Sequence, residues 1–482
     1  MGDGLWAPRY RMLIVGLVLT VTFVASEALA VITVMPVVAR DLGGLRLYGW
    51  VFSAFMLGSI VGIVAAGREA DRRGPVVPFL AGLVLFGAGL GVAGLAPDMP
   101  VLVAGRVLQG IGAGAVPAVA YVSIGRGLPR ALQPKMMALL STAWVVPGLA
   151  GPALSAEVAH AFGWRWVFLG LLPIVAVSGS IAVPALIRLG RPDSAGAPEH
   201  RLSDALRTAA GVALMLGGLT LAGESARWGL AAAGGGLVAA GALIALPALR
   251  RLVPPGTASA RRGLPATILS RGLLTFAFFG ADAYVTLTIT VLRHRSPVYA
   301  GIAVTGATLT WTVGAWLQAR LSTAWPGRRL VRTGLIIILA GIGGMLLVLQ
   351  PAVPVAVALA AWSVAGLGMG LCYAPITLMM LREAPAGREG WASASLNLAD
   401  VLGAAIGIGV GGAAVAAGSG PHAGLRWGVA AAFGICAAVA VLALVVSPRL
   451  PAGPTSAPAA PGPPGDARED ELVSRPDGRG TR

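Results

Sequence analysis

The chain contains 482 residues, of which 56% are hydrophobic and only 12% are charged, and its mean hydropathy is +0.80. Soluble domains carry about 25% charged residues, so this composition excludes an ordinary soluble protein. The net charge of +16 could indicate a nucleic-acid partner, but the arginines lie in short segments between apolar runs and form no basic face with interleaved aromatic residues. We therefore expect no nucleic-acid partner.

Repeated apolar runs of about 20 residues predict transmembrane helices, because a helix of that length crosses the hydrocarbon core of a bilayer. The first run, from Met12 to Val38, is too long for a cleavable signal and is expected to remain as the first span. We predict an all-α polytopic membrane protein with fourteen spans, at residues 12–38, 48–66, 76–95, 101–124, 136–159, 166–187, 208–223, 229–248, 269–292, 300–320, 332–349, 354–380, 391–417 and 424–447.

Basic residues are distributed unevenly between the segments that connect these spans. Most fall in the N-terminal segment and in the links after every second span, among which we count Arg271. The other links hold only Arg40, Arg46, Arg165, Arg227, Arg293, Arg295 and Arg426. Because positively charged loops stay on the cytoplasmic side, we expect a multi-pass protein of the inner (plasma) membrane with both termini in the cytoplasm.

Two features of the first half of the chain return in the second half. Asp282 lies 255 residues after Glu27 (282 − 27), and each acid stands in the middle of an apolar run. The Gly-x-Gly-x-Gly segment at 110–114 returns at 366–370, 256 residues later (366 − 110). Parallel repeats with ionisable groups near the membrane midplane are typical of secondary transporters.

The repeat predicts two six-helix halves, with the seventh and eighth spans as an inserted hairpin. We expect an N-terminal six-helix bundle at 1–190, a linker with two extra transmembrane helices at 191–265, and a C-terminal six-helix bundle at 266–448. Residues 449–482 are rich in Pro, Ala and Gly and then charged, which predicts a disordered cytoplasmic tail.

The second span is followed by GREADRRG at residues 67–74, which contains Gly67, Asp71, Arg72 and Gly74. We interpret it as a short loop whose carboxylate docks on the N-terminus of another helix. A contact of this kind can form in one conformation and break in the other, so the segment is a candidate conformational latch. The alternative is an ordinary solvated loop.

Two further motifs lie inside apolar spans. Arg106 opens the sequence RVLQGIGAG at 106–114, and an arginine in such a helix needs a charged partner or a wet cavity. Arg106 therefore either forms a structural ion pair or takes part in coupling transport to a proton or substrate. Gly151 and Pro152 lie in PGLAGPALSA at 147–156, where small residues allow close helix packing and the proline bends the span.

These motifs resemble those of the major facilitator superfamily. Residues 67–74 match the first eight positions of the loop signature G-x-x-x-D-R-x-G-R-[RK], whose last two basic residues are replaced by Pro75 and Val76. Residues 106–113 match R-x-x-Q-G-x-G-A, and 147–156 resemble the antiporter signature G-x-x-x-G-P-x-x-G-G with its central Gly-Pro intact. Residues 27–36 are similar to the D-x-T-I-V-N-V-A-L-P element of fourteen-span drug:proton antiporters, with Glu27 in place of Asp. The resemblance implies the major facilitator fold, with two six-helix pseudo-repeats, the inserted hairpin and a central cavity between the halves.

Four charged residues inside the spans are candidates for proton coupling or substrate binding: Glu27, Asp282, Arg106 and Asp400. A carboxylate in a low-dielectric site can bind and release protons near neutral pH. In the family, the helices that carry Glu27 and Asp282 line the cavity. The alternative for each acid is a structural role, held by hydroxyl groups or an arginine; Asp400 could pair with Arg106.

Aromatic residues on or beside the same spans are candidates to line the cavity: Trp50, Phe55, Trp144, Tyr284 and Trp311. An apolar, aromatic pocket with one or two carboxylates suits lipophilic or cationic organic compounds. The sequence contains no phosphate-binding loop and no metal-ligand spacing, so we expect no cofactor and no metal site.

The expected function is proton-coupled export of amphipathic organic compounds, either drugs, antibiotics or secondary metabolites, and not an enzymatic reaction. Partners would be the substrate, protons and the lipid bilayer, and the protein would work as a monomer because two halves already enclose a site. An uptake permease or proton symporter on the same fold is an alternative. A lipid or peptidoglycan-precursor exporter and a non-transporting membrane sensor or scaffold also remain open.

Overall fold

The structure is a computed structural model that describes residues 5–129, 132, 136, 139–140, 143, 145–190, 200–224, 228–322, 324–385, 389–418 and 424–452. Within these residues it contains fourteen helices of 16 residues or more and no strand. Thirteen helices of the described part are long and apolar enough to cross a membrane. The prediction of an all-α polytopic membrane protein is confirmed.

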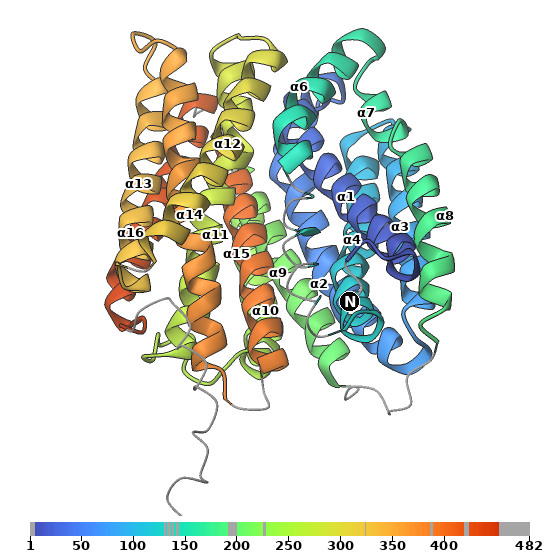
Figure 1. The fold of residues 1–482 in the computed structure, drawn as a ribbon. Coiled ribbons are helices and arrows are strands. Elements are labelled where there is room, and N and C mark those ends of the chain that lie inside the picture. The colour runs from blue at the N-terminus through green and yellow to red at the C-terminus, as the bar shows by residue number, and fades with distance from the viewer. Residues whose placement is uncertain are drawn as a thin grey trace, which may run out of the picture.

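The first bundle is formed by helices from the first half of the chain (Figure 1). Asp98 caps one of them by accepting a 2.9 Å hydrogen bond from the backbone of Val101, which satisfies an amide that the helix leaves free. The elements are α1 (Pro8–Asp41), η1 (Leu45–Leu47), α2 (Tyr48–Arg73), α3 (Val76–Gly94), α4 (Met99–Gly127), α6 (Val145–Phe162), α7 (Arg165–Leu169) and α8 (Leu172–Ile187).

The second bundle repeats this arrangement beside the first (Figure 1). Its first helix continues into a π-helical turn, and such turns are frequent at functional sites. The elements are α11 (Leu264–Leu287), η2 (Thr288–Leu292), α12 (Pro297–Leu321), α13 (Gly327–Val348), α14 (Ala356–Glu383), α15 (Glu389–Gly418), α16 (Leu425–Val446) and η3 (Ser447–Arg449).

The inserted hairpin consists of α9 (His200–Glu224) and α10 (Trp228–Leu252). Glycines allow the two helices to approach closely: a Cβ atom on Gly218 would lie 2.5 Å from the carbonyl oxygen of Gly234. Apolar residues of α9 share one buried cluster with residues of α2 and α15, so the hairpin packs against both bundles. Figure 1 shows α9 and α10 between the two bundles.

Several sequence-based assignments of residues to loops are wrong; Arg40 and Arg426, for example, lie in terminal turns of α1 and α16. The segment 67–74 is not a loop, because α2 continues to Arg73 and ends only at Gly74, whose φ of 85° is the left-handed conformation that glycine accepts. Arg271 is also not in a loop, because it is a buried residue of α11. The predicted domain boundaries stay predictions, and the predicted tail lies outside the described residues from position 453 onward.

Candidate functional site

Glu27 of α1 and Arg106 of α4 form a buried ion pair in the first bundle. The Nη1 group of Arg106 donates to Oε1 of Glu27 and, at 2.6 Å, to the side-chain oxygen of Gln109. Its Nε donates to the carbonyl oxygen of Val51 at 3.0 Å, and the guanidinium lies 4.3 Å above the ring of Phe55. Several elements therefore fix the orientation of this arginine.

The ion pair leaves one carboxylate oxygen free. Oε2 of Glu27 has no hydrogen-bond partner among the described residues, although Glu27 is completely buried. Buried polar atoms are nearly always hydrogen-bonded, so an orphaned oxygen of this kind needs a reason. It provides a position where a proton can attach without displacing Arg106 from the other oxygen.

Asp282 of α11 has a neutral partner in the second bundle. Its Oδ1 accepts a 2.7 Å hydrogen bond from the indole nitrogen of Trp362 on α14. The ring of Phe278 stacks on that indole, with centroids 5.2 Å apart and an angle of 19°. Asp282 is 7% exposed, and no ion pair to it occurs within the part of the chain that the structure describes. Its charge is therefore not neutralised by a cation there.

The two carboxylates occupy corresponding positions of the repeat. Asp282 follows Glu27 by 255 residues, and Trp362 follows Arg106 by 256 residues (362 − 106). Each bundle thus sets the acid of its first helix against the same position of its fourth helix. Only the first bundle places a cation at that position, so the two acids have different electrostatic surroundings.

Asp400 of α15 pairs with Arg271 of α11, so the alternative pairing with Arg106 is wrong. Oδ1 of Asp400 lies 3.7 Å from Nε of Arg271, and Oδ2 accepts a 3.0 Å hydrogen bond from the hydroxyl of Tyr373. Arg271 also donates to the Tyr373 carbonyl at 3.1 Å and to the Thr377 hydroxyl. Its guanidinium lies 3.6 Å above the Tyr373 ring, which favours the cation.

Arg271, Tyr373 and Trp362 are not among the candidate site residues that the sequence predicts. The signal for Arg271 was present, because apolar residues flank it on both sides in the run from Leu264. An arginine inside such a run needs a partner. The signal for Trp362 was its position, because it follows Arg106 at the repeat spacing of 256 residues. Tyr373 gave no comparable signal, because Tyr is common at membrane–water interfaces.

The five candidate cavity aromatics lie in different environments. The ring of Phe55 lies against the guanidinium of Arg106. Trp311 is half-buried and contacts the rings of Phe278 and Tyr373, each at 5.6 Å between centroids. Trp311 therefore continues an aromatic strip from Trp362 to Tyr373.

The other three aromatics have no such place in that strip. Trp50 donates to Thr220 of α9 at 3.3 Å, and Tyr284 is buried with its hydroxyl on the carbonyl of Ile408. Trp144 lies outside the described residues. Whether any of the five contacts substrate stays a prediction.

The two bundles contact each other near the ends of α1, α11 and α15 and the start of α2. Tyr48 donates to the carbonyl of Ala283 at 3.0 Å, and Thr286 donates to the carbonyl of Ile32 at 2.9 Å. A Cβ atom on Gly49 would lie only 2.7 Å from Cα of Gly412, so α2 and α15 are in backbone contact there. These helix ends form the interface at the membrane face opposite the N-terminus.

The Gly151–Pro152 element lies at the same interface. Pro152 is inside α6, and its carbonyl oxygen would be 3.1 Å from a Cβ atom on Gly301 of α12. In Figure 1, α6 and α12 are the neighbouring helices of the two bundles. Small residues thus allow close packing between bundles at this point.

The candidate latch forms the last turns of α2. Glu69 lies 3.5 Å from Arg72 and 3.4 Å from Arg73, so the arginines pair within their own helix. Gly67 has open space around it, because an added Cβ atom would meet nothing within 4 Å. The side chain of Asp71 is not among the described parts of the structure. The latch stays a prediction.

Comparison with known proteins identifies similar transporters. The family model of the Major Facilitator Superfamily matches residues 14–408. A protein of Mycobacterium tuberculosis (strain CDC 1551 / Oshkosh), named as a probable multidrug-efflux transporter, is 28% identical over 438 residues, covering 88% of this chain and 91% of its own. The multidrug transporter protein MdtP of Bacillus subtilis is 29% identical over 221 residues, covering 46% of this chain and 40% of its own.

Solved structures share the fold at low sequence identity. A POT family transporter, crystallised with 5-aminolevulinic acid, has a TM-score of 0.63 at 14% identity and covers 91% of this chain and 96% of its own. The human organic anion transporter MFSD10 has a TM-score of 0.58 at 16% identity and covers 92% of this chain and 100% of its own. At these identities the likeness concerns the fold alone.

Proposed function

The chain belongs to the Major Facilitator Superfamily, and on that basis we propose that it is a proton-coupled exporter of amphipathic organic compounds. The relatives named as multidrug-efflux transporters support an exported substrate of the drug or metabolite type. We place both termini on the cytoplasmic side of the plasma membrane, because the arginine distribution favours that orientation. We also propose a monomer, because two bundles already enclose a site.

The observation that carries this proposal is the pair of buried acids at corresponding positions of the two bundles. Glu27 forms an ion pair with Arg106, and its other oxygen has no hydrogen-bond partner among the described residues, which suits a group that binds and releases a proton. Among the described residues Asp282 has only a neutral hydrogen-bond donor, which suits a group that accepts either a proton or the cationic centre of a substrate. We therefore assign proton coupling first to Glu27 and substrate exchange first to Asp282.

The conformation of the interface supports a direction for the cycle. The bundles meet through Tyr48 and Thr286 at the face opposite the N-terminus, which in our orientation is the outer face. Substrate would enter from the cytoplasm in this conformation and displace protons from the acids. After the outer interface opens and the cytoplasmic side closes, protons would bind the acids and release the substrate outward. The segment 67–74 would hold the second state through contacts at the cytoplasmic face.

The aromatic strip supports a flat, lipophilic substrate. Phe278, Trp311 and Tyr373 continue from Trp362, so a bound cation would have ring faces beside the Asp282 carboxylate. Aromatic faces attract organic cations, and apolar pockets with a few polar groups are typical of small-molecule sites. Arg271 and Asp400 lie at the Tyr373 end of the strip, where we propose a second polar contact for the substrate.

Everted membrane vesicles test this proposal. An imposed pH gradient, acidic inside, should drive accumulation of the fluorescent cation ethidium by the wild-type protein. Glu27→Gln should abolish the dependence of ethidium accumulation on the pH gradient. Asp282→Asn should weaken the binding of ethidium itself. Accumulation in right-side-out vesicles driven by an inward proton gradient would instead support the symporter or uptake alternative. Ethidium flux through the wild-type protein that does not depend on the pH gradient would contradict proton coupling.

A further inference from the structure

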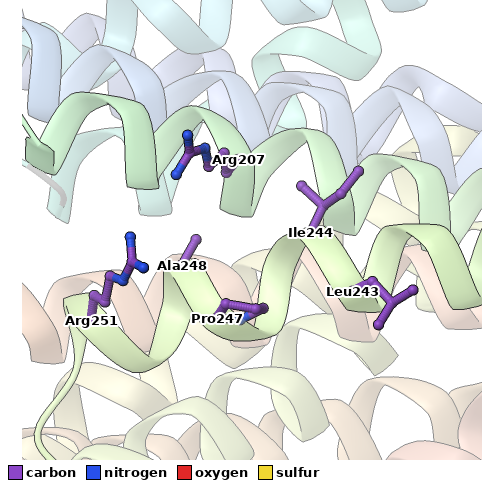
Figure 2. Close-up of a pocket in the computed structure, with 6 residues that line it drawn as sticks. All are labelled: Arg207, Leu243, Ile244, Pro247, Ala248 and Arg251. Atoms are coloured by element: carbon purple, nitrogen blue, oxygen red, sulfur yellow. The ribbon is translucent and has the colours of Figure 1, made fainter.

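The inserted hairpin carries a pocket that the transport cycle does not use. It lies between α9 and α10 and is lined by Arg207, Leu243, Ile244, Pro247, Ala248 and Arg251. Figure 2 shows the two guanidinium groups on the side where α10 ends, with Ile244 and Leu243 farther along the helix. The pocket thus has a basic end and an apolar end.

The location of this pocket fits the boundary between water and lipid. Arg251 is one residue from the end of α10, and α9 begins seven residues before Arg207. Six spans precede α9 in the fourteen-span arrangement that the sequence predicts, so in that arrangement these two helix ends lie at the same membrane face as the start of α1. The basic end is therefore at the depth of lipid headgroups, and the apolar end points along the helices into the hydrocarbon region.

Helix α10 is strongly exposed to the surroundings of the protein. Only 17% of the apolar, membrane-length stretch of α10 is buried inside the protein, whereas 83% of the corresponding stretch that begins with α11 is buried. Leu243 is 76% exposed and Ile244 is 39% exposed. In a membrane these side chains contact lipid acyl chains, so the apolar end of the pocket is already a lipid-facing surface.

The basic end carries an excess of positive charge. Nη1 of Arg207 lies 3.8 Å and Nη1 of Arg251 lies 3.6 Å from the same oxygen of Asp204. One buried carboxylate thus orients two exposed arginines, and Arg250 adds a third positive charge to the last turn of α10. That carboxylate oxygen has no hydrogen-bond partner among the described residues, so both pairs are ionic contacts without a hydrogen bond.

We propose that this pocket binds an anionic phospholipid, with its phosphate between Arg207 and Arg251 and an acyl chain along Leu243 and Pro247. Guanidinium groups bind phosphate oxygens through paired N–H donors. Basic pockets between transmembrane helices are typical sites for acidic headgroups. Asp204 contacts both arginines. Because it carries a single negative charge against two positive charges, net positive charge remains to bind the lipid phosphate. The hairpin is then a lipid-binding element on a transporter of two bundles.

Native mass spectrometry of the detergent-purified protein tests this proposal with phosphatidylglycerol and with phosphatidylcholine of the same acyl chains. The wild type should retain phosphatidylglycerol in preference to phosphatidylcholine. Arg207→Gln/Arg251→Gln should weaken phosphatidylglycerol binding by about thirtyfold, taking each arginine at the value typical of juxtamembrane basic residues. Asp204→Asn should strengthen it, because the substitution removes the competing negative charge.

The matched control is Arg329→Gln/Arg332→Gln, which removes the same charge from the start of α13 at the same membrane face. It should leave phosphatidylglycerol binding within about twofold of the wild type, since lipid attraction falls off within a Debye length. Equal losses in both double variants would overturn the proposal, because only a general attraction to basic residues would remain. Unchanged binding in Asp204→Asn together with equal retention of the two lipids would overturn it as well.

Discussion

The indole nitrogen of Trp362 donates a 2.7 Å hydrogen bond to the carboxylate of Asp282. The same two positions of the first bundle hold the Glu27–Arg106 ion pair. One architecture therefore presents a carboxylate paired with a cation in one half and a carboxylate with a neutral donor in the other. This difference is the basis for assigning different roles to the two acids.

Replacing Trp362 with Phe should destabilise the protein, because the substitution leaves Asp282 buried without its donor. The expected loss is about 1–3 kcal/mol, the usual cost of an unsatisfied buried polar group. Thermal unfolding in detergent measures it. Trp311→Phe is the control, since it removes an indole from the same aromatic strip without touching the carboxylate. Equal stability losses in the two variants would contradict the role of the hydrogen bond.

Replacing Arg106 with Gln should cost more, because it leaves the Glu27 carboxylate as a buried, unpaired charge. Breaking a buried ion pair typically costs about 3–5 kcal/mol. The double variant Glu27→Gln/Arg106→Gln should recover most of this stability, since no charge remains. It should not recover ethidium transport if Glu27 carries the coupling proton. Recovery of both stability and transport would show that the pair is only structural.

The sequence predicted those parts of the site that appear as charges in apolar runs. Glu27, Asp282 and Arg106 were found in this way, because an ionisable residue in a membrane helix is costly and therefore informative. The residues that contact them could not be predicted, because the position of a residue along its helix does not show which neighbouring helix its side chain faces. Arg271 was missed because it is near the start of its helix, where the positive-inside pattern equally predicts a loop.

The same limit explains the error at residues 67–74. Gly67 and the charged residues after it are typical of a turn, yet Arg, Glu and Ala are also good helix formers. The helix therefore continues until Gly74, where the backbone adopts a positive φ. The fold class was more predictable, because it depends on many apolar runs and on the spacing of the two halves.

The pairing of Arg271 and Asp400 should appear as a coupling energy between the two residues. We expect Arg271→Gln and Asp400→Asn each to lower stability, and the double variant to lose about 1–3 kcal/mol less than the sum of the single losses. A double-mutant cycle by thermal or denaturant unfolding measures this difference. Tyr373→Phe is a useful third variant, because it removes only the hydroxyl that binds Asp400. Additive losses would contradict a direct interaction.

The contact between Gly49 and Gly412 should control opening of the outer face. Gly49→Ala should lengthen the distance across that face, because the new Cβ atom would lie 2.7 Å from Cα of Gly412. Spin labels at Arg46→Cys in η1 and Val298→Cys in α12 report this distance, and both native cysteines are buried. Gly343→Ala is the control, since an added Cβ atom there meets nothing within 4 Å. An unchanged distance distribution in Gly49→Ala would contradict the assignment of this interface as the outer gate.

The most direct test of the central claim measures protons released when substrate binds. Purified protein in weak buffer with a pH-sensitive dye should release protons on addition of ethidium, because the cation replaces protons at the buried acids. Glu27→Gln should release fewer protons while ethidium binding, followed by its fluorescence, persists. Binding without proton release in the wild type, or identical release in Glu27→Gln, would contradict proton-coupled exchange through Glu27.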